Sequence, residues 1–162
     1  DSVASRGLEM CIRDRDPRFK QGIFTPRNPK KFIGTRAVYR SSFELRFMQW
    51  ADHNDNVLEW SSEQIIIPYI SPVDGRAHRY YVDNFVVIRE GDKIKRYLVE
   101  IKPFSQTQPP RTSPRKRKAT IIYEQTQWLV NQAKWAAAQK YARDKGAEFI
   151  ILTERELFAN KA

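Results

Sequence analysis

Hydrophobic residues recur along the chain with two different periods, and the order of these periods predicts a mixed fold. Apolar residues three and four apart are typical of helices, whereas runs of β-branched and aromatic residues are typical of strands. Helices are predicted in residues 39–52, 121–146 and 153–162, and strands in 57–72, 79–90, 93–103 and 147–152. The order helix, strands, hairpin, helix, strand, helix indicates an α/β domain with a small mixed β-sheet flanked by α-helices.

The N-terminal stretches follow neither period. Residues 1–15 show no pattern that leads into the rest, and we interpret them as a non-native or disordered segment; a short partner-binding arm is the alternative. Residues 16–35 are rich in Pro, Lys and Arg, which predicts an extended arm lying over the domain. We therefore expect one domain over residues 16–162, a length that suits a single hydrophobic core.

The first predicted helix carries an acidic residue on its apolar side. Ser41 or Ser42 is suited to cap this helix, and Glu44 then lies three and four residues before Phe47 and Met48. Its carboxylate is thus expected among apolar neighbours. A position at the helix rim, or an interaction with the positive N-terminal end of the helix, is the alternative interpretation.

The long predicted helix ends at a recognisable signal. Arg143 and Lys145 lie in its last turn, and Gly146 follows directly. The residues expected to face the core are Trp128, Leu129, Ala133, Ala136 and Ala137.

A two-residue turn predicts the register of the central hairpin. Gly91 and Asp92 separate the two central strands, and glycine at the first turn position suits a type II′ turn. Counting back along both strands from this turn places Asp83 opposite Glu100. A register slipped by one residue would break this arrangement.

The facing pair of Asp83 and Glu100 requires a nearby positive charge. Directly opposed residues have Cβ atoms roughly 5 Å apart, where like charges destabilise a sheet. A divalent cation removes this penalty, and Mg²⁺ is typically held by one or two carboxylates together with a substrate phosphate. Lys102 projects from the same face as Glu100 and is expected to reach into the site. Electrostatic relief of the acids is the simpler interpretation of this lysine.

Basic residues dominate the charge of the chain. A net charge of +10 and a pI of about 9.9 favour a polyanionic partner, with nucleic acid ahead of a membrane, although solubility alone is the alternative. The loop at 105–119 concentrates positive charge in Arg111, Arg115, Lys116, Arg117 and Lys118. We expect a mobile loop that follows a phosphate backbone, and a solvated linker is the alternative.

At this point the ordered motifs resemble a known superfamily. An acid on an early helix, then Val-Asp, then Glu-Ile-Lys at a strand end are similar to the PD-(D/E)XK nucleases. The segments YRSSFELRF, SPVDGRAHRYYVDNFV and YLVEIKP, followed by the basic loop and YEQTQWLVNQAKWAAA, resemble more closely the head completion nucleases of T-even-like tailed phages. TnsA-type transposon endonucleases are similar at a greater distance. The resemblance spans residues 17–158 and implies a restriction-endonuclease-like core.

The resemblance also implies roles for individual residues. Asp83, Glu100 and the backbone carbonyl of Ile101 would ligate the metal, and Glu44 would complete the site directly or through water. Lys102 would position the attacking water and stabilise charge that develops on the phosphate. Mg²⁺ is the implied cofactor, with Mn²⁺ as an alternative.

The implied function is that of an Mg²⁺-dependent endodeoxyribonuclease that trims or cuts DNA when phage heads are completed after packaging. Its partners would be DNA and phage portal or neck proteins. Its location would be the host bacterial cytoplasm or the virion, because no apolar run approaches the roughly 20 residues that span a bilayer. Arg40 and Arg79 flank the acids in sequence and are candidate phosphate contacts. A noncatalytic DNA-binding head or neck protein and a TnsA-like transposon endonuclease are the alternatives.

Overall fold

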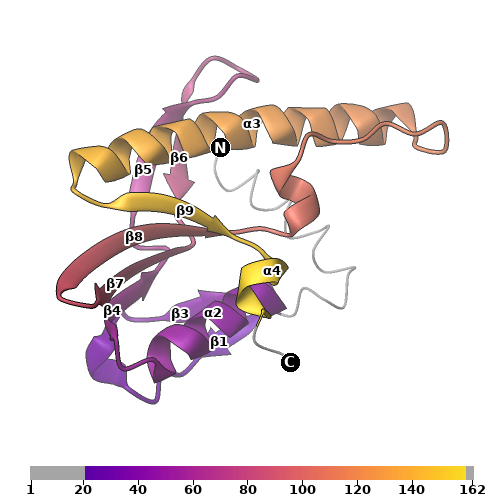
Figure 1. The fold of residues 1–162 in the computed structure, drawn as a ribbon. Helices are drawn as coiled ribbons and strands as arrows, with labels where there is room; N and C mark the ends of the chain where they lie inside the picture. The colour runs from indigo at the N-terminus through magenta and orange to yellow at the C-terminus, as the bar shows by residue number, and fades with distance from the viewer. Residues whose placement is uncertain (1–20, 160–162) are drawn as a thin grey trace.

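A five-stranded mixed sheet forms the centre of the computed structural model, which describes residues 21–159 (Figure 1). The strands are β1 (Gly22–Phe24), β2 (Phe32–Ile33), β3 (Ala37–Tyr39), β4 (Val57–Ser62), β5 (Ile66–Ile70), β6 (Ala77–Tyr81), β7 (Asn84–Glu90), β8 (Lys93–Ile101) and β9 (Glu148–Leu152). The helices are α2 (Ser42–His53), α3 (Lys118–Asp144) and α4 (Glu154–Leu157), with 3₁₀ turns η1 (Pro29–Lys31) and η2 (Phe104–Thr107). The predictions for residues 1–15 lie outside the described residues.

The sheet has the strand order β2-β4-β7-β8-β9. The two outermost pairs run parallel, and the central strand β7 runs antiparallel to both of its neighbours, β4 and β8. Strands β1 and β3 form one separate two-stranded sheet, and β5 and β6 form another. The predicted α/β class, with a small mixed sheet flanked by helices, is confirmed.

Side-chain alternation along β8 directs two hydrophobic cores to opposite faces of the sheet. Val99 packs with Phe47 of α2 and with Trp60 on one face, and Leu98 packs with Ala138 of α3 on the other. Figure 1 shows the two helices on either side of the sheet. Within residues 21–159, no helix combines the length and apolarity needed to cross a bilayer.

The predicted register of the β7–β8 hairpin is confirmed. Asn84 pairs with Val99, and Glu90 pairs with Lys93 across the turn. Gly91 has a φ of +61°. Asp92 is not among the described residues that have a positive φ. Only the first position of the turn is therefore left-handed, as in a type II′ turn.

The run 79–90 is two strands rather than the single strand that its composition predicts. Pairing of β4 with β7 ends at Ser62 and Asn84, and pairing of β5 with β6 begins at Ile66 and Tyr81. The three residues 63–65, which connect β4 to β5, therefore lie opposite the two residues 82–83, which connect β6 to β7. This extra residue is a β-bulge, which bends the chain and increases the local twist. The β5–β6 pair consequently leaves the sheet as a separate ribbon.

The bend places Glu63 in a left-handed conformation, with a φ of +54°. A side chain in this region costs roughly 1–2 kcal/mol, because its Cβ approaches the following carbonyl oxygen. The Glu63 N–H donates to the Asp83 carbonyl oxygen over 3.1 Å, and the Val82 N–H donates to Ile65 over 3.0 Å. These two bonds hold the bulge together.

The described part of the predicted N-terminal arm is built into the fold. Phe32 of β2 pairs in parallel with Trp60 of β4. The Phe24 and Phe32 rings lie 5.9 and 4.7 Å from the Trp60 ring, measured between centroids. Phe24 and Phe32 anchor this stretch, and its high content of Pro, Lys and Arg gives no indication of their role.

The predicted core face of the long helix is wrong in part. Leu129 and Ala136 are exposed, whereas Trp135, Ala138 and Ala142 are buried. Alanine occurs on every side of this helix, so apolar spacing alone does not identify its buried face.

Replacing Trp60 by alanine is expected to destabilise the protein by about 3–5 kcal/mol, because a fully buried ring is lost. Trp50→Ala is the matched control, since Trp50 is 40% exposed, and should cost less than half as much. Urea unfolding monitored by far-UV circular dichroism measures both. Equal losses in the two variants would contradict the central position of Trp60.

Candidate active site

The predicted site residues meet where β7 begins and β8 ends. Glu44, Glu100 and Lys102 are 4%, 4% and 8% exposed, respectively. Ionisable side chains are seldom buried to this extent unless they are paired. This burial separates them from ordinary surface charges and identifies the end of β8 as a candidate active site.

Glu100 is held from two directions. The Tyr80 hydroxyl donates a hydrogen bond to Glu100 Oε2. Lys102 Nζ lies 3.5 Å from Glu100 Oε1. Burial, followed by the negative charges of Glu100 and Asp83, raises the pKa of Tyr80 well above its ordinary value, so this hydroxyl keeps its proton and remains a donor.

Asp83 lies just before β7 and bonds across the hairpin. Its Oδ2 accepts the Ile101 N–H over 2.8 Å. Burial raises the pKa of Asp83 well above its ordinary value, and the charges of Glu100 and Glu44 raise it further. Lys102 and the Ile101 N–H oppose this shift. The charges of Glu100 and Glu44 therefore both act on Asp83.

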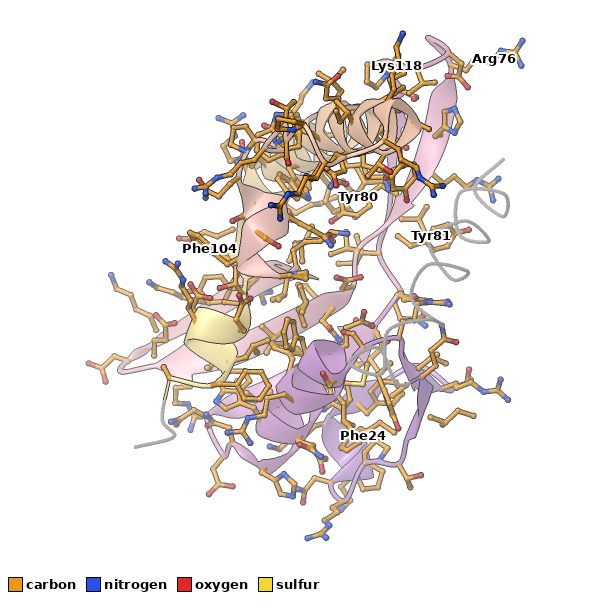
Figure 2. All side chains as sticks on the ribbon, turned by 90° about the vertical axis from the view of Figure 1, so that its right-hand side faces the viewer. Phe24, Arg76, Tyr80, Tyr81, Phe104 and Lys118 are labelled. Carbon is orange, nitrogen blue, oxygen red and sulfur yellow. The ribbon has the colours of Figure 1, made fainter. Side chains whose placement is uncertain are left out.

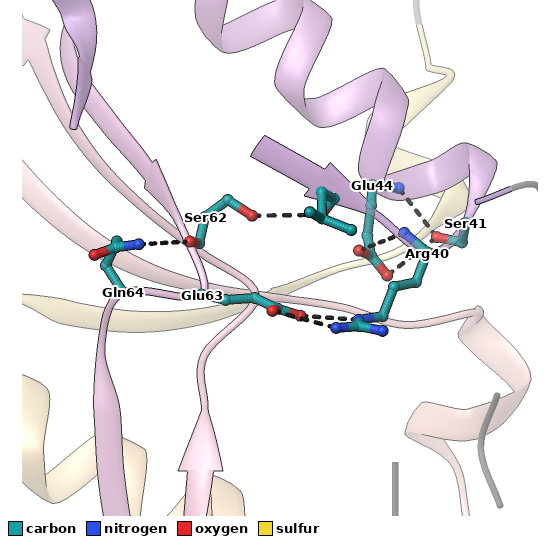
Figure 3. Close-up of polar contacts among 7 residues, drawn as sticks. Arg40, Ser41, Glu44, Ser62, Glu63 and Gln64 are labelled. Atoms are coloured by element: carbon teal, nitrogen blue, oxygen red, sulfur yellow. Dashed lines mark hydrogen bonds and ion pairs between the residues drawn. The ribbon is translucent and has the colours of Figure 1, made fainter. Parts of the chain in front are cut away.

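Glu44 reaches the site from the first turn of α2. The predicted cap is confirmed at Ser41, whose side chain accepts the Glu44 N–H over 3.1 Å. Glu44 Oε2 in turn accepts the Arg40 N–H over 3.1 Å (Figure 3). The interaction with the helix N-terminus, considered as the alternative role of Glu44, thus exists alongside its proximity to Asp83.

The donor set suits a hard divalent cation, although the side chains are not already closed around one. Asp83 and Glu100 lie close enough at the open end of the hairpin to interact electrostatically, and Mg²⁺ is commonly held by two carboxylates and a substrate phosphate. Within residues 21–159, no three His, Cys, Asp or Glu side chains are grouped closely enough to hold a metal by themselves. Two protein carboxylates with substrate oxygens therefore fit this arrangement better than a cage made by the protein alone.

The two arginines proposed for phosphate contact have different environments. Arg40 Nε donates to Glu63 Oε1 over 2.9 Å, and the neighbouring carboxylates of Glu63, Glu44 and Asp83 help to raise its pKa. Arg79 is exposed on β6. Arg40 therefore lies beside the acids, whereas Arg79 lies on the ribbon.

The basic loop exposes most of its positive charge. Arg111, Arg115 and Arg117 are exposed, whereas Lys116 forms a 2.8 Å ion pair with Glu124 of α3. Lys118 is the first residue of α3 and is also exposed, as Figure 2 shows. Four of the five predicted cations thus remain available to a phosphate backbone.

Two residues of the site were not predicted from the sequence. The hydrogen bond from Tyr80 to Glu100 depends on the bend after β6, which no local pattern in the sequence indicates. Figure 2 shows Tyr80 directed beneath α3, with Tyr81 on the outer side of the ribbon. Glu63, which bonds Arg40, has no recognisable sequence signal, because its position depends on the bulge.

Comparison with known proteins agrees with these observations. Residues 54–154 match the model of a family described as TnsA-like endonuclease N terminal. The chain is also 37% identical over 146 residues to the head completion nuclease of Enterobacteria phage T4, an alignment that covers 85% of this chain and 93% of that protein. The chain belongs to the TnsA-like endonuclease family.

Family membership confirms the restriction-endonuclease-like fold class and the nuclease resemblance. The TnsA-like match contains Asp83, Glu100 and Lys102 together with the basic loop. Glu44 lies before the matched range.

Asp83→Asn is expected to stabilise the metal-free protein at neutral pH. Because folding raises the pKa of Asp83, the folded state keeps a proton that the unfolded state has already lost. The stability contributed by this group therefore falls as pH rises from the ordinary carboxylate pKa through the raised value. The melting temperature of the variant should exceed that of wild type increasingly across this window, by roughly 2–4 °C for each kcal/mol of repulsion relieved.

Asp74→Asn provides a control of opposite sign. The Arg76 N–H and His78 lower the pKa of Asp74, so its carboxylate adds stability that is lost as pH falls. Thermal unfolding at several pH values in chelator measures both variants. A pH-independent difference between Asp83→Asn and wild type would contradict the raised pKa of Asp83.

Proposed function

We propose that this protein is a metal-dependent endodeoxyribonuclease that trims or cuts DNA during head completion of a tailed phage, after packaging. The observation that carries the proposal is the cluster of the buried Glu44, Glu100 and Lys102 with the half-buried Asp83, in a chain 37% identical to the T4 head completion nuclease. Gathering three acids and a lysine largely away from water has an electrostatic cost that a purely structural role does not require.

Asp83 and Glu100 are the proposed metal ligands, with the Ile101 carbonyl oxygen as a third. Glu44 completes the site, either directly or through water, while its own carboxylate stays anchored to the Arg40 N–H. Mg²⁺ is the proposed ion, and Mn²⁺ is the alternative. When bound, such an ion polarises the scissile phosphate and makes water a better nucleophile.

The protein groups orient the reactants. Lys102 supplies a buried ammonium group next to Glu100, where it can position water and stabilise negative charge that develops on the phosphate. The Tyr80 hydroxyl fixes one oxygen of Glu100 and so leaves a defined direction for the other. Because these groups are largely removed from bulk water, each charge interaction is stronger than it would be at the surface.

The proposed DNA contacts come from three segments of the chain. Arg40 lies beside the acids, Arg79 lies on the β5–β6 ribbon, and the basic loop precedes α3. Phosphate contacts of this kind position a duplex without reading its sequence. Portal or neck proteins are proposed partners, since the DNA to be trimmed would lie at the portal. The host cytoplasm, or the virion itself, is the proposed location.

A cleavage assay tests the proposal. Wild type should cut DNA when Mg²⁺ or Mn²⁺ is added and should not cut in chelator. Asp83→Ala and Lys102→Ala should each lower the rate roughly 100-fold or more, because each removes a charge used in the transition state. Blunt, overhanging and branched substrates, resolved on denaturing gels, identify the preferred DNA. Wild type that binds DNA and never cuts would support the noncatalytic alternative.

Replacing Arg111, Arg115 and Arg117 together by alanine should weaken DNA binding. The slope of log affinity against log salt concentration should fall by about 0.9 for each phosphate contact removed. Lys116→Ala is the matched control, because Lys116 already pairs with Glu124, and should have a smaller effect. Fluorescence anisotropy between 50 and 200 mM salt, roughly the range in which such contacts weaken, measures both. Unchanged affinity in the triple variant would exclude the loop as a DNA contact.

A further inference from the structure

Glu63 occupies a position at which the backbone favours glycine. Among residues 21–159 it is the only non-glycine residue with a positive φ. Bulges of this kind commonly have glycine in the left-handed position, because glycine has no Cβ to clash. The backbone alone therefore gives no reason for a glutamate here, and the contacts of its side chain become the relevant observation.

The Glu63 side chain connects two parts of the candidate active site. Its Oε1 accepts Arg40 Nε over 2.9 Å, and its Oε2 lies 3.4 Å from Arg40 Nη2 (Figure 3). The Arg40 backbone N–H donates to Glu44 Oε2 over 3.1 Å. In the other direction, the Glu63 backbone N–H donates to the Asp83 carbonyl oxygen over 3.1 Å. A continuous path of hydrogen bonds thus runs from Asp83 through Glu63 and Arg40 to Glu44.

This path joins two acids that come from separate elements. Glu44 belongs to the first turn of α2, and Asp83 lies in the bulge before β7. Arginine bonded by two nitrogens to a carboxylate is geometrically specific, since the planar guanidinium fixes direction as well as distance. Both side chains of the ion pair are about one-fifth to one-quarter exposed, at 21% and 24%. Such a partly solvated pair contributes little to folding, so its main effect is on geometry.

We infer that Glu63 is a positioning residue, which fixes Glu44 relative to Asp83 by holding Arg40. The inference rests on the proposed nuclease function, because it assigns Glu63 to the support of the same site. Glu63 itself touches neither the metal nor DNA in this assignment. Its carboxylate acts through the Arg40 backbone, and its strained conformation is what places that carboxylate beside Arg40.

Glu63→Gly separates the side chain from the bulge. Glycine adopts the left-handed conformation readily, so the bulge is preserved and the melting temperature should be unchanged or raised. The kcat for DNA cleavage should fall about 10-fold or more, because small displacements of catalytic groups cost rate steeply. The KM for DNA should stay unchanged. A purely structural role would instead lower the melting temperature along with activity.

Glu63→Gln and Glu90→Gly complete the set of variants. Glutamine keeps an oxygen that can accept Arg40 Nε, so Glu63→Gln should recover most of the lost kcat. Glu90 is an exposed carboxylate paired with Lys95 over 3.1 Å at the opposite end of the hairpin. Glu90→Gly removes a comparable ion pair far from the acids, and its kcat should match wild type.

Mn²⁺ binding in the absence of DNA provides a readout independent of cleavage. Titration calorimetry should show about 10-fold weaker Mn²⁺ binding to Glu63→Gly than to wild type, as is typical when a group supporting metal ligands is removed. Wild-type kcat and Mn²⁺ affinity in Glu63→Gly would overturn the inference. A raised KM with unchanged kcat would also overturn it, because Glu63 would then act on DNA binding through Arg40. Wild type that binds Mn²⁺ but cuts no DNA would instead refute the proposed function, and calorimetry would still decide the role of Glu63.

Discussion

Carboxylates gathered in one place repel one another, and the fold offsets this repulsion with at least one directed hydrogen-bond donor for each acid. The Tyr80 hydroxyl serves Glu100, a strand N–H serves Asp83, and the Arg40 N–H serves Glu44. These donors come from the ribbon, the central hairpin and the turn before α2. The acids can therefore be brought together only when all three segments are folded, which makes assembly of the site and of the fold a single event.

The bend between the sheet and the β5–β6 ribbon brings Tyr80 and Asp83 into contact with the end of β8. In a continuous strand with the observed β7–β8 register, Tyr80 would lie beyond the last residue of β8. The bulge instead turns β6 toward α3, so that the Tyr80 ring is buried while its hydroxyl points back at the end of β8. It also frees Asp83 from regular strand pairing, and its side chain then bonds the Ile101 N–H. Bulges next to active sites often redirect side chains in this way.

The parts of the site that could be predicted from the sequence depend on local signals. The Gly91 turn determines which residues of β7 and β8 face each other, and Ser41 with Glu44 forms a helix start whose pattern lies within four residues. Both signals act between neighbours in the chain, so they can be read without knowing the rest of the fold. The motif of Glu100 and Lys102 at the end of a strand is of the same local kind.

The parts that could not be predicted depend on pairing between distant segments. The bulge exists because three residues between β4 and β5 face only two residues between β6 and β7. It can be recognised only when both pairings are known, so the sequence of one segment does not reveal it. Tyr80 and Glu63 acquire their contacts from that bulge. The predicted core face of α3 was wrong in part for a different reason. Alanines occur on every side of this helix, so packing against the ribbon and the sheet determines which side is buried.

The shortness of β2 has a consequence for how copies of this protein meet. It pairs with β4 through only two residues, Phe32 and Ile33, at one border of the five-stranded sheet. A border strand this brief offers little unpaired backbone for another chain to extend. Its attachment through Phe32 and Trp60 keeps that cover over Trp60 and Ser61 of β4, so another chain cannot pair with the backbone at these two residues.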